Sequence, residues 1–375
     1  MSVRKRKWVT STGEQKEAWI VDYADQDGDR HIETFARKKD ADVRHAAVSV
    51  DVAKGDHIAP SKSDTVAGAA EKWIKRVEAL GRERATVRQY RQHIDLHIRP
   101  RLGAVKLAHL TTAKAESFRD DLLASMSRPL ARKVWTSFKS ILKSAKRGQV
   151  AADITIGTDK RKRKLEVGVD IPTPDEIRRL LRAAEGADMR ERTLLTLVIS
   201  TGLRASELRG LRWKDVDLKH SELHVRQRAD RFNVIGAPKS ETSVRDISFG
   251  SRALACLKQW RLACPKGEAD LVFPTASGNV EHHKNMLRSI DAIMTRAGLV
   301  DKSGEPKYAL HAMRHFYASW CINRKADGGR ELPAKNVQQL LGHSSILMTM
   351  DTYGHLFPQS NDRAELEAAS ATLWA

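Results

Sequence analysis

A tyrosine near the C-terminal end of the chain stands in a setting that could make it reactive. Tyr353 follows His343 in the stretch LGHSSILMTMDTYGHLF, where polar residues occupy positions at which a buried helix would have apolar ones. A phenol is a poor nucleophile while it is protonated, with a pKa of about 10, but neighbouring cations and a base promote its ionisation. The stretch therefore indicates either a packed aromatic residue or a nucleophile held beside phosphate-binding groups.

A second motif, TGLRASELRGLRW, places Arg204 directly after a glycine turn and close to the start of a predicted helix. Helix N-termini favour anions, and a guanidinium group can bind two phosphate oxygens at once. Glu207 follows one helical turn later on the same face. An isolated pair with this spacing is ordinarily a salt bridge, so the motif alone leaves both interpretations open.

A third motif, YALHAMRHFYASW, has His311 and Arg314 on adjacent turns of a predicted helix. Such a pair supplies a titratable imidazole and a second fixed cation. A metal site is the alternative, because His311 and His315 have a spacing at which both could bind one ion. The glutamate of the H-E-x-x-H metalloprotease motif is absent and Arg314 would lie close to the metal, so the sequence disfavours a metal site.

The order of these motifs resembles the catalytic set of the tyrosine recombinases, the phage integrase family. Arg204 is followed by a lysine in a predicted β-turn, then by His311 and Arg314, by His343 and by Tyr353. The best-matching strings are TGLRASELRGLRWKDVD, HAMRHFYAS and LGHSSILMTMDTYGH. Upstream, HIRPRLGAVKLAHLT resembles the helical core-binding domain of the family, and the N-terminal segment resembles, with lower specificity, the arm-type DNA-binding module of many integrases.

The resemblance implies a role for each matching residue. Tyr353 would attack a DNA phosphodiester and form a 3′-phosphotyrosyl bond. Arg204 and Arg314 would bind the non-bridging oxygens of the scissile phosphate, and His343 would donate a hydrogen bond to the phosphate. These roles agree with the physical requirement, because the transition state has extra negative charge that fixed cations stabilise.

Three further residues complete the set that the resemblance implies. His311 would help to accept the tyrosine proton. Lys239, in GAPKSETSVRD, would act as general acid for the departing 5′ oxygen. Glu207 would be an accessory acid that orients the site and does not react. Ala312, where the family often has an acidic residue, and Leu347, in place of a more usual polar residue, depart from the pattern without removing a reacting group.

No cofactor and no metal are expected for this chemistry. A covalent protein–DNA bond conserves the energy of the broken phosphodiester, so rejoining needs neither ATP nor a metal ion. The sequence contains no G-x-x-x-x-G-K-[ST] phosphate-binding loop and no Asp/Glu cluster typical of two-metal nucleases.

A multidomain, mainly α fold is expected to position these groups. Residues 1–57 have the strand-like runs KWVTST, AWIVDYA and HIETFA before a helical pattern, and predict a small β-rich arm-type DNA-binding domain. Residues 62–150 predict an all-helical core-binding domain with a SAM-like fold. Residues 151–170, with the basic run KRKRK, predict a linker, either crossing DNA or simply hydrated. Residues 171–375 predict a mixed α+β catalytic domain.

Local signals predict several element boundaries. Thr173, Pro174 and Glu176 form a capping box that marks a helix start. Pro100 is expected to end the helix containing TVRQYRQHIDLHIRP. Gly342 is expected to let the chain turn so that the following histidine reaches the phosphate.

The charge balance predicts a polyanionic partner. Lys and Arg number 66 against 47 Asp and Glu, a net charge of +19, which favours nucleic acid; no long apolar run supports a membrane as partner. The cysteines form no C-x-x-C pair, so neither a disulfide framework nor a zinc site is indicated and a reducing cytoplasm fits best. These cysteines are Cys256, Cys264 and Cys321.

The resemblance also implies an assembly on DNA. The partners would be double-stranded attachment sites of a mobile element in a bacterial nucleoid, bound by a homotetramer, with an excisionase or a host DNA-bending factor as further partners. The C-terminal helix would dock on a neighbouring protomer, or else on its own core. The apolar residues of that helix are Leu366, Ala369, Leu373 and Trp374.

Two other functions remain open on the sequence. A DNA-binding protein that kept the fold without catalysis is disfavoured by the intact set of reacting groups. A type IB topoisomerase shares the chemistry but needs no specific sites and no tetramer. An arm-binding domain favours an integrase over a chromosome-dimer resolvase, which usually lacks one.

Overall fold

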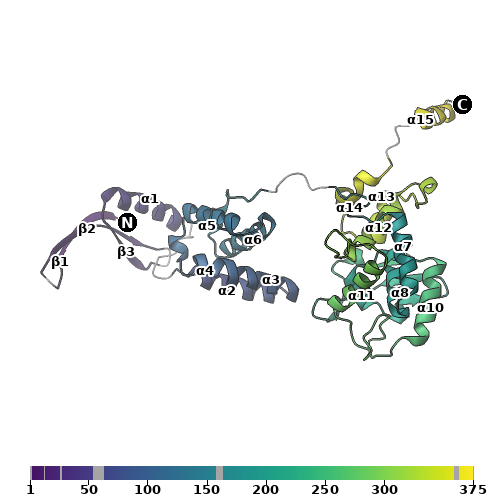
Figure 1. Cartoon of the computed structure of the whole chain (residues 1–375). Coiled ribbons are helices and arrows are strands. Elements are labelled where there is room, and N and C mark those ends of the chain that lie inside the picture. The colour runs from purple at the N-terminus through teal and green to yellow at the C-terminus, as the bar shows by residue number, and fades with distance from the viewer. Residues whose placement is uncertain are drawn as a thin grey trace. The chain divides into compact units, whose positions relative to one another are not determined.

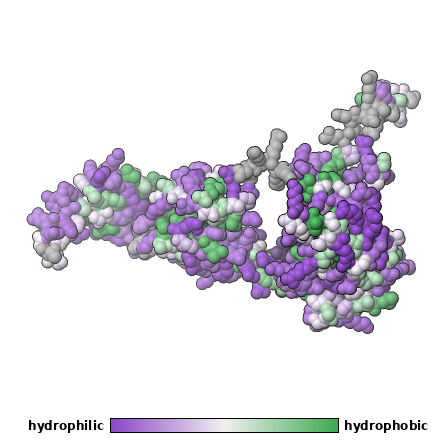
Figure 2. All heavy atoms as spheres, in the orientation of Figure 1, coloured by the Kyte–Doolittle hydropathy of each residue, from purple (hydrophilic) through white to green (hydrophobic). Residues whose placement is uncertain are grey.

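The computed structural model describes residues 2–11, 13–25, 28–53, 63–157, 164–358 and 363–374. The chain divides into two compact units, Met1–Arg161 and Lys162–Ala375. Helices dominate and the strands are few (Figure 1), so the predicted mainly α, multidomain fold is confirmed. Hydrophilic residues cover most of the visible surface (Figure 2). No helix in the described residues has both the length and the apolar character that crossing a bilayer requires.

The first unit begins with an antiparallel sheet packed on one helix. The strands β1 (Ser2–Val9), β2 (Gln15–Ala24) and β3 (Arg30–Phe35) lie in the order β1-β2-β3, followed by α1 (Lys38–Ala53). β1 begins earlier than the predicted KWVTST strand and ends at Val9, because residues 2–9 pair continuously with β2. The sheet and α1 share a small core of Val21, Tyr23, Ala41 and Val48.

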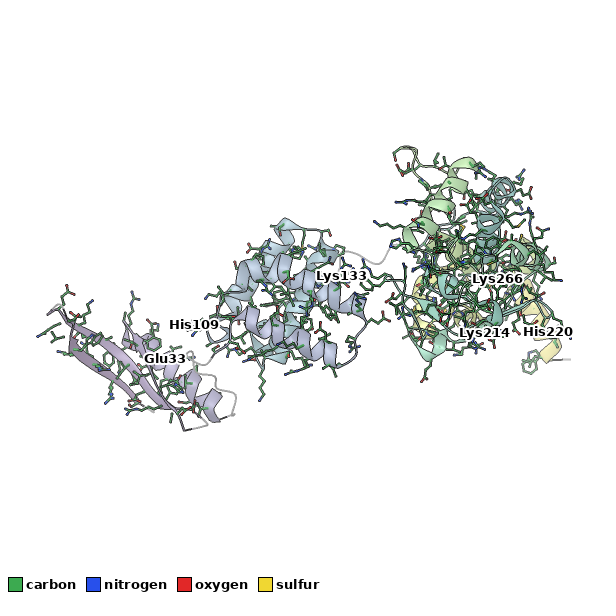
Figure 3. All side chains as sticks on the ribbon, turned by 90° about the horizontal axis from the view of Figure 1, so that it is seen from below. Glu33, His109, Lys133, Lys214, His220 and Lys266 are labelled. Atoms are coloured by element: carbon green, nitrogen blue, oxygen red, sulfur yellow. The ribbon has the colours of Figure 1, made fainter. Side chains whose placement is uncertain are left out.

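The remainder of the first unit is helical, as predicted. Its helices are α2 (Val66–Ala79), α3 (Arg84–His93), α4 (Arg99–Leu102), α5 (Thr112–Ser125) and α6 (Arg128–Ser144). They enclose a core that includes Trp73, Phe118 and Phe138. Basic side chains such as Lys133 on α6 are exposed on its surface (Figure 3).

The expectation that a helix ends at Pro100 is wrong. The helical path continues through a π turn, Ile94–Ile98, into α4, which ends at Leu102. The N–H of Arg99 donates to the carbonyl of Ile94, one residue further back than in an α-helix. Pro100 therefore lies in the first turn of a new helical segment, where its missing N–H needs no intrahelical partner.

The second unit combines helices with two small sheets. An antiparallel sheet has the order β4-β5-β8, and β6 pairs with β7. The strands are β4 (Val216–Asp217), β5 (Glu222–Val225), β6 (Arg228–Ala229), β7 (Ile235–Gly236) and β8 (Arg245–Ser248). The helices are α7 (Pro174–Glu185), α8 (Met189–Thr201), α9 (Ala205–Gly210), α10 (Ser251–Ala263), α11 (His283–Arg296), α12 (His311–Ile322), α13 (Ala334–Leu341), α14 (Ile346–Tyr353) and α15 (Arg363–Leu373).

The predicted capping box at the start of α7 is confirmed. The Thr173 hydroxyl accepts the N–H of Glu176 at 3.2 Å, and the Glu176 carboxylate accepts the N–H of Thr173 at 2.8 Å. The same carboxylate also accepts hydrogen bonds from Lys307 and from the hydroxyl of Tyr308, at 2.7 and 2.8 Å. The cap therefore ties α7 to the segment that leads into α12.

Two apolar clusters stabilise the second unit. The larger one joins helices α7 to α11 with the β4-β5-β8 sheet. The smaller one joins α12, α13 and α14, and it includes Tyr317, Val337, Leu341 and Tyr353. The ring of the predicted nucleophile is thus part of a hydrophobic core, which fixes where its hydroxyl lies.

Gly202, between α8 and the Arg204 motif, should tolerate no side chain. Its φ is 62°, and a Cβ atom there would overlap the ring of Tyr317. We expect Gly202→Ala to lower the free energy of unfolding by about 2–5 kcal/mol, because left-handed strain and overpacking add. The shift in urea midpoint measures this. Gly186→Ala is the control, because Gly186 has a φ of −90° and a Cβ atom there would lie at ordinary contact distances from its neighbours. Equal shifts in the two variants would contradict the account.

Candidate active site

Arg204 connects the start of α9 to the end of α13. The chain reaches it through Gly202, whose φ of 62° reverses the direction of α8. Its guanidinium donates to Glu207 at 2.7 Å and to the carbonyl of Gly342 at 3.0 Å. The salt bridge that the spacing suggested is therefore present. The side chain nevertheless keeps 32% of its surface exposed, which leaves part of the guanidinium accessible to a ligand.

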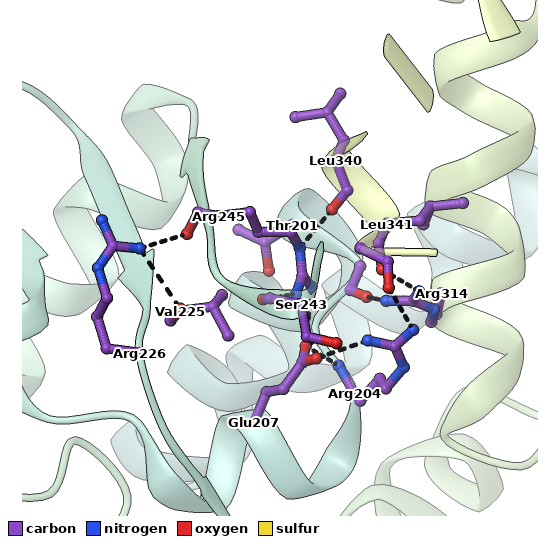
Figure 4. A network of polar contacts seen from close by, with 12 residues as sticks. Thr201, Arg204, Glu207, Val225, Arg226, Ser243, Arg245, Arg314, Leu340 and Leu341 are labelled. Atoms are coloured by element: carbon purple, nitrogen blue, oxygen red, sulfur yellow. Dashed lines mark hydrogen bonds and ion pairs between the residues drawn. The ribbon is translucent and has the colours of Figure 1, made fainter. Parts of the chain in front are cut away.

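Glu207 is buried and binds a second arginine that the sequence reasoning missed. Arg245 on β8 donates to the two Glu207 oxygens at 2.8 and 3.2 Å (Figure 4). It also donates to the carbonyls of Ser243 and Leu340, at 2.9 and 2.7 Å. Burial alone would raise the pKa of Glu207, but Arg245, Arg204 and Arg314 outweigh it and lower the pKa to about 2. Glu207 is therefore a permanent anion at neutral pH.

Arg314 lies almost fully inside the protein. Only 2% of the residue is exposed, and its guanidinium donates to the carbonyls of Gly202, at 2.7 Å, and Leu341. Burial and the nearby Arg204 charge lower its pKa to about 9, while Glu207 opposes that shift. Arg314 thus keeps its charge at neutral pH, and its position is set by two carbonyl groups and not by a salt bridge.

The predicted turn at Gly342 is present. Gly342 ends α13 with a φ of 60°, and a Cβ atom there would lie 2.9 Å from a guanidinium nitrogen of Arg245. The turn directs His343 inward, where its Nδ1 shares a hydrogen bond of 2.9 Å with the hydroxyl of Thr349. Burial and three neighbouring arginines lower the pKa of His343 to about 4, so the imidazole is neutral at pH 7.

Tyr353, at the end of α14, has a buried hydroxyl with a partner. The residue is 1% exposed, and its Oη lies 2.7 Å from Nδ1 of His315. The His343 ring stacks parallel to the Tyr353 ring with centroids 6.3 Å apart. Burial raises the pKa of Tyr353 to about 12 against the opposing effect of Arg314 and Arg204. The phenol is therefore protonated in the free protein.

His311 occupies the first position of α12 and is exposed. Its ring meets the ring of His315 edge to face, with centroids 4.7 Å apart. The hydrogen-bond partner of the tyrosine hydroxyl is thus His315, which the sequence reasoning weighed only as a metal ligand. The signal that could have found it was its place directly after Arg314, on the helix face shared with His311. The described residues contain no cluster of three or more His, Cys, Asp or Glu suited to a metal ion.

Lys239 lies in the loop between β7 and β8 and is exposed. This loop, and not the predicted β-turn alone, connects the strands, and it contains a short 3₁₀ turn, Glu241–Ser243. Lys239 lines a cavity of about 430 Å³ together with Arg204, Glu207 and Gly342. The structure therefore places the predicted lysine and the first predicted arginine around one space.

The comparisons with known proteins agree on one family. The sequence model of the Phage integrase family matches residues 172–360. A tyrosine recombinase XerC-like protein of Caldanaerobacter subterraneus subsp. tengcongensis is 26% identical over 78% of this chain and 79% of its own. The ICEBs1 integrase of Bacillus subtilis is 23% identical over 71% of this chain and 72% of its own.

Two solved structures share the fold. The Tn1549 transposon integrase bound to circular intermediate DNA has a TM-score of 0.64 and 20% identity, and the match covers 82% of this chain and 100% of that one. A lambda integrase tetramer bound to a Holliday junction has a TM-score of 0.54 and 18% identity, and the match covers 90% of this chain and 95% of that one.

The neutral histidines should make stability depend on pH. His315 and His343 both have a pKa of about 4 when folded and about 6.5 when unfolded, so the unfolded chain binds more protons between these values. Unfolding should therefore become easier as pH falls through this window. Between pH 6.5 and 5.5, each histidine should lower the free energy of unfolding by about 1 kcal/mol.

Urea denaturation at the two pH values measures this change. The His315→Gln and His343→Gln proteins should each show a smaller loss than the wild type. An unchanged pH dependence in both variants would contradict the burial of neutral imidazoles.

Proposed function

We propose that this chain, which belongs to the phage integrase family, cuts and rejoins DNA at specific sites to integrate or excise a mobile element. It is a tyrosine recombinase, an enzyme that transfers DNA strands. The observation that supports the reaction best concerns Arg204 and Arg314. Hydrogen bonds to carbonyl groups hold both guanidinium groups, and both positive charges act to lower the pKa of the buried Tyr353 hydroxyl.

The proposed reaction begins with binding of the scissile phosphate. Arg204 and Arg314 bind its non-bridging oxygens. Arg204 is held by a carboxylate and a carbonyl, and Arg314 by two carbonyls, so both cations are in place before the reaction. Neutral His343 donates to the phosphate from Nε2, with its Nδ1 accepting the hydroxyl of Thr349. The two positive charges also favour the ionised form of Tyr353.

In the proposed cleavage step, the Tyr353 oxygen attacks phosphorus and a 3′-phosphotyrosyl bond forms. The bond from phosphorus to the 5′ oxygen breaks, and that oxygen receives a proton from Lys239. The tyrosine proton passes to an imidazole of α12, the role that the resemblance assigned to His311. Rejoining reverses these steps with a 5′ hydroxyl as nucleophile, so bond energy is conserved and neither ATP nor a metal is required.

The N-terminal sheet supports the proposed arm-type DNA-binding role of residues 1–57. Asp22 on β2 binds Arg4 on β1 and Arg30 on β3, at 3.0 and 2.8 Å, which aligns both cations on one face of the sheet. Strand surfaces of this kind can enter a DNA groove. We assign core-site binding to the helices of residues 62–150, whose exposed cations include Arg88 and Lys133. Residues 151–170 remain the proposed linker, and most of its basic run, 160–163, lies outside the described residues.

Assembly on DNA is the remaining part of the proposal. A related fold forms a tetramer on a Holliday junction, and we assign a homotetramer on double-stranded attachment sites to this chain. In α15, Leu366, Leu373 and Trp374 are 71%, 77% and 83% exposed, which supports exchange of this helix between protomers. An excisionase or a host DNA-bending factor would be a further partner, and the bacterial nucleoid the place of action.

Tyr353→Phe should abolish covalent attachment to DNA and leave DNA binding nearly unchanged. We would incubate the protein, with EDTA present, with nicked duplexes tiled across the chromosomal DNA beside its gene, and detect SDS-resistant adducts. Tyr317→Phe is the matched control, because Tyr317 lies in the same apolar cluster, and it should still form the adduct. Adducts from the Tyr353→Phe protein, or none from wild type despite salt-sensitive binding, would overturn the proposal.

A further inference from the structure

The hydroxyl of Tyr353 is hydrogen-bonded to a residue whose role the family motifs do not define. Nδ1 of His315 lies 2.7 Å from Tyr353 Oη, and the two rings meet at 61° with centroids 5.7 Å apart. His315 is on α12 and Tyr353 ends α14, and both helices pack in the smaller apolar cluster. The contact is therefore fixed by the core and not by surface side chains.

The direction of this hydrogen bond follows from the two protonation states. Burial, His311 and Arg314 lower the pKa of His315 to about 4, so its imidazole is neutral and has one acceptor nitrogen. The pKa of Tyr353 is raised to about 12, so the phenol keeps its proton. The phenol therefore donates to Nδ1, and the imidazole hydrogen is on Nε2.

A carboxylate acts on the same imidazole from another segment. Asp170 opposes the other shifts and raises the pKa of His315. Its own carboxylate accepts the N–H of Glu166 at 3.0 Å, which holds it in the turn before α7. The charged and titratable groups around His315 are thus His311 and Arg314 on its own helix, Asp170 from that turn, and Tyr353 from α14.

We infer that His315 is the base that removes the Tyr353 proton during DNA cleavage, with Asp170 as a positioning residue that stabilises the imidazolium. This inference rests on the proposed function. The Oη–H bond breaks as the proton moves to Nδ1, and the freed electron pair forms the bond to phosphorus. The pair from the broken phosphorus–oxygen bond goes to the 5′ oxygen, and in rejoining the imidazolium returns its proton to Tyr353.

This arrangement also gives His311 a role that differs from accepting the tyrosine proton, which the resemblance implied. Its ring contacts His315 and not the Tyr353 hydroxyl, so it acts on the base from the exposed start of α12. In this arrangement a base lies beside the nucleophile, and a third group stabilises the charged form of the base. Here the three groups come from α14, α12 and the turn before α7, so only the folded unit assembles them.

The test compares two substitutions of His315 on the nicked duplex that traps wild-type protein. His315→Asn keeps an acceptor oxygen near the position of Nδ1 but cannot take the proton, whereas His315→Ala removes both. We expect both proteins to bind DNA as wild type does and to form adduct about 10²–10⁴-fold more slowly. Added imidazole should partly restore His315→Ala and should leave Tyr353→Phe inactive.

A matched control removes a histidine from a His–Asp pair outside the site. His224 on β5 lies 2.7 Å from Asp246, and His224→Asn should cleave at the wild-type rate. Wild-type cleavage by His315→Asn would overturn the inference, because holding the hydroxyl would then suffice. A slow His315→Ala protein that imidazole does not restore would also overturn it.

A second measurement does not depend on DNA. Histidine NMR of the free protein should show the pKa of His315 rising by about half a unit or more in Tyr353→Phe, because the lost donor had favoured the neutral ring. Asp170→Asn should lower it. An unchanged titration in Tyr353→Phe would overturn the contact itself, whereas a wild type that forms no adduct would overturn the proposed function and leave this result intact.

Discussion

The site depends on one buried carboxylate that two arginines share. Glu207 binds Arg204 and Arg245, and these arginines in turn bind the carbonyls of Gly342 and Leu340 at the end of α13. Without the anion, Arg245 would be an unpaired buried charge, which is strongly unfavourable. The carboxylate therefore determines where α9, β8 and α13 meet, and with them the start of the chain segment that leads to Tyr353.

A second constraint is the burial of Tyr353, the proposed nucleophile. Its ring belongs to an apolar cluster, which raises the pKa of Tyr353 to about 12 and keeps the phenol protonated. Arg204 and Arg314 oppose that shift, and the neutral imidazole of His315 lies within hydrogen-bond distance of the hydroxyl. Burial in the cluster thus both positions the Tyr353 hydroxyl and lowers its reactivity. The surrounding cations and imidazole offset the loss of reactivity.

The sequence predicted what local signals determine. The capping box at Thr173, the turn at Gly342 and the Arg204–Glu207 pair all depend on neighbours within one helical turn. Arg245 and His315 were missed, because their contacts join segments far apart in the chain. The prediction at Pro100 failed since a π turn changed the hydrogen-bond register before it. In α14, Leu347 is 68% exposed while Thr349 is buried, so hydrophobicity alone did not identify its inner face.

The most direct test of this account is a double-mutant cycle between Glu207→Gln and Arg245→Met, with the rate of covalent adduct formation as readout. If the shared carboxylate positions the site, each single change should slow cleavage about 100-fold. The double variant should be little slower than either single variant, because each change already breaks the same Glu207–Arg245 ion pair. Arg226→Met is the control, since Arg226 contacts this network through the backbone carbonyls of Val225 and Arg245 and not through Glu207 (Figure 4). If the double variant instead slows cleavage by the product of the two single factors, the account is contradicted.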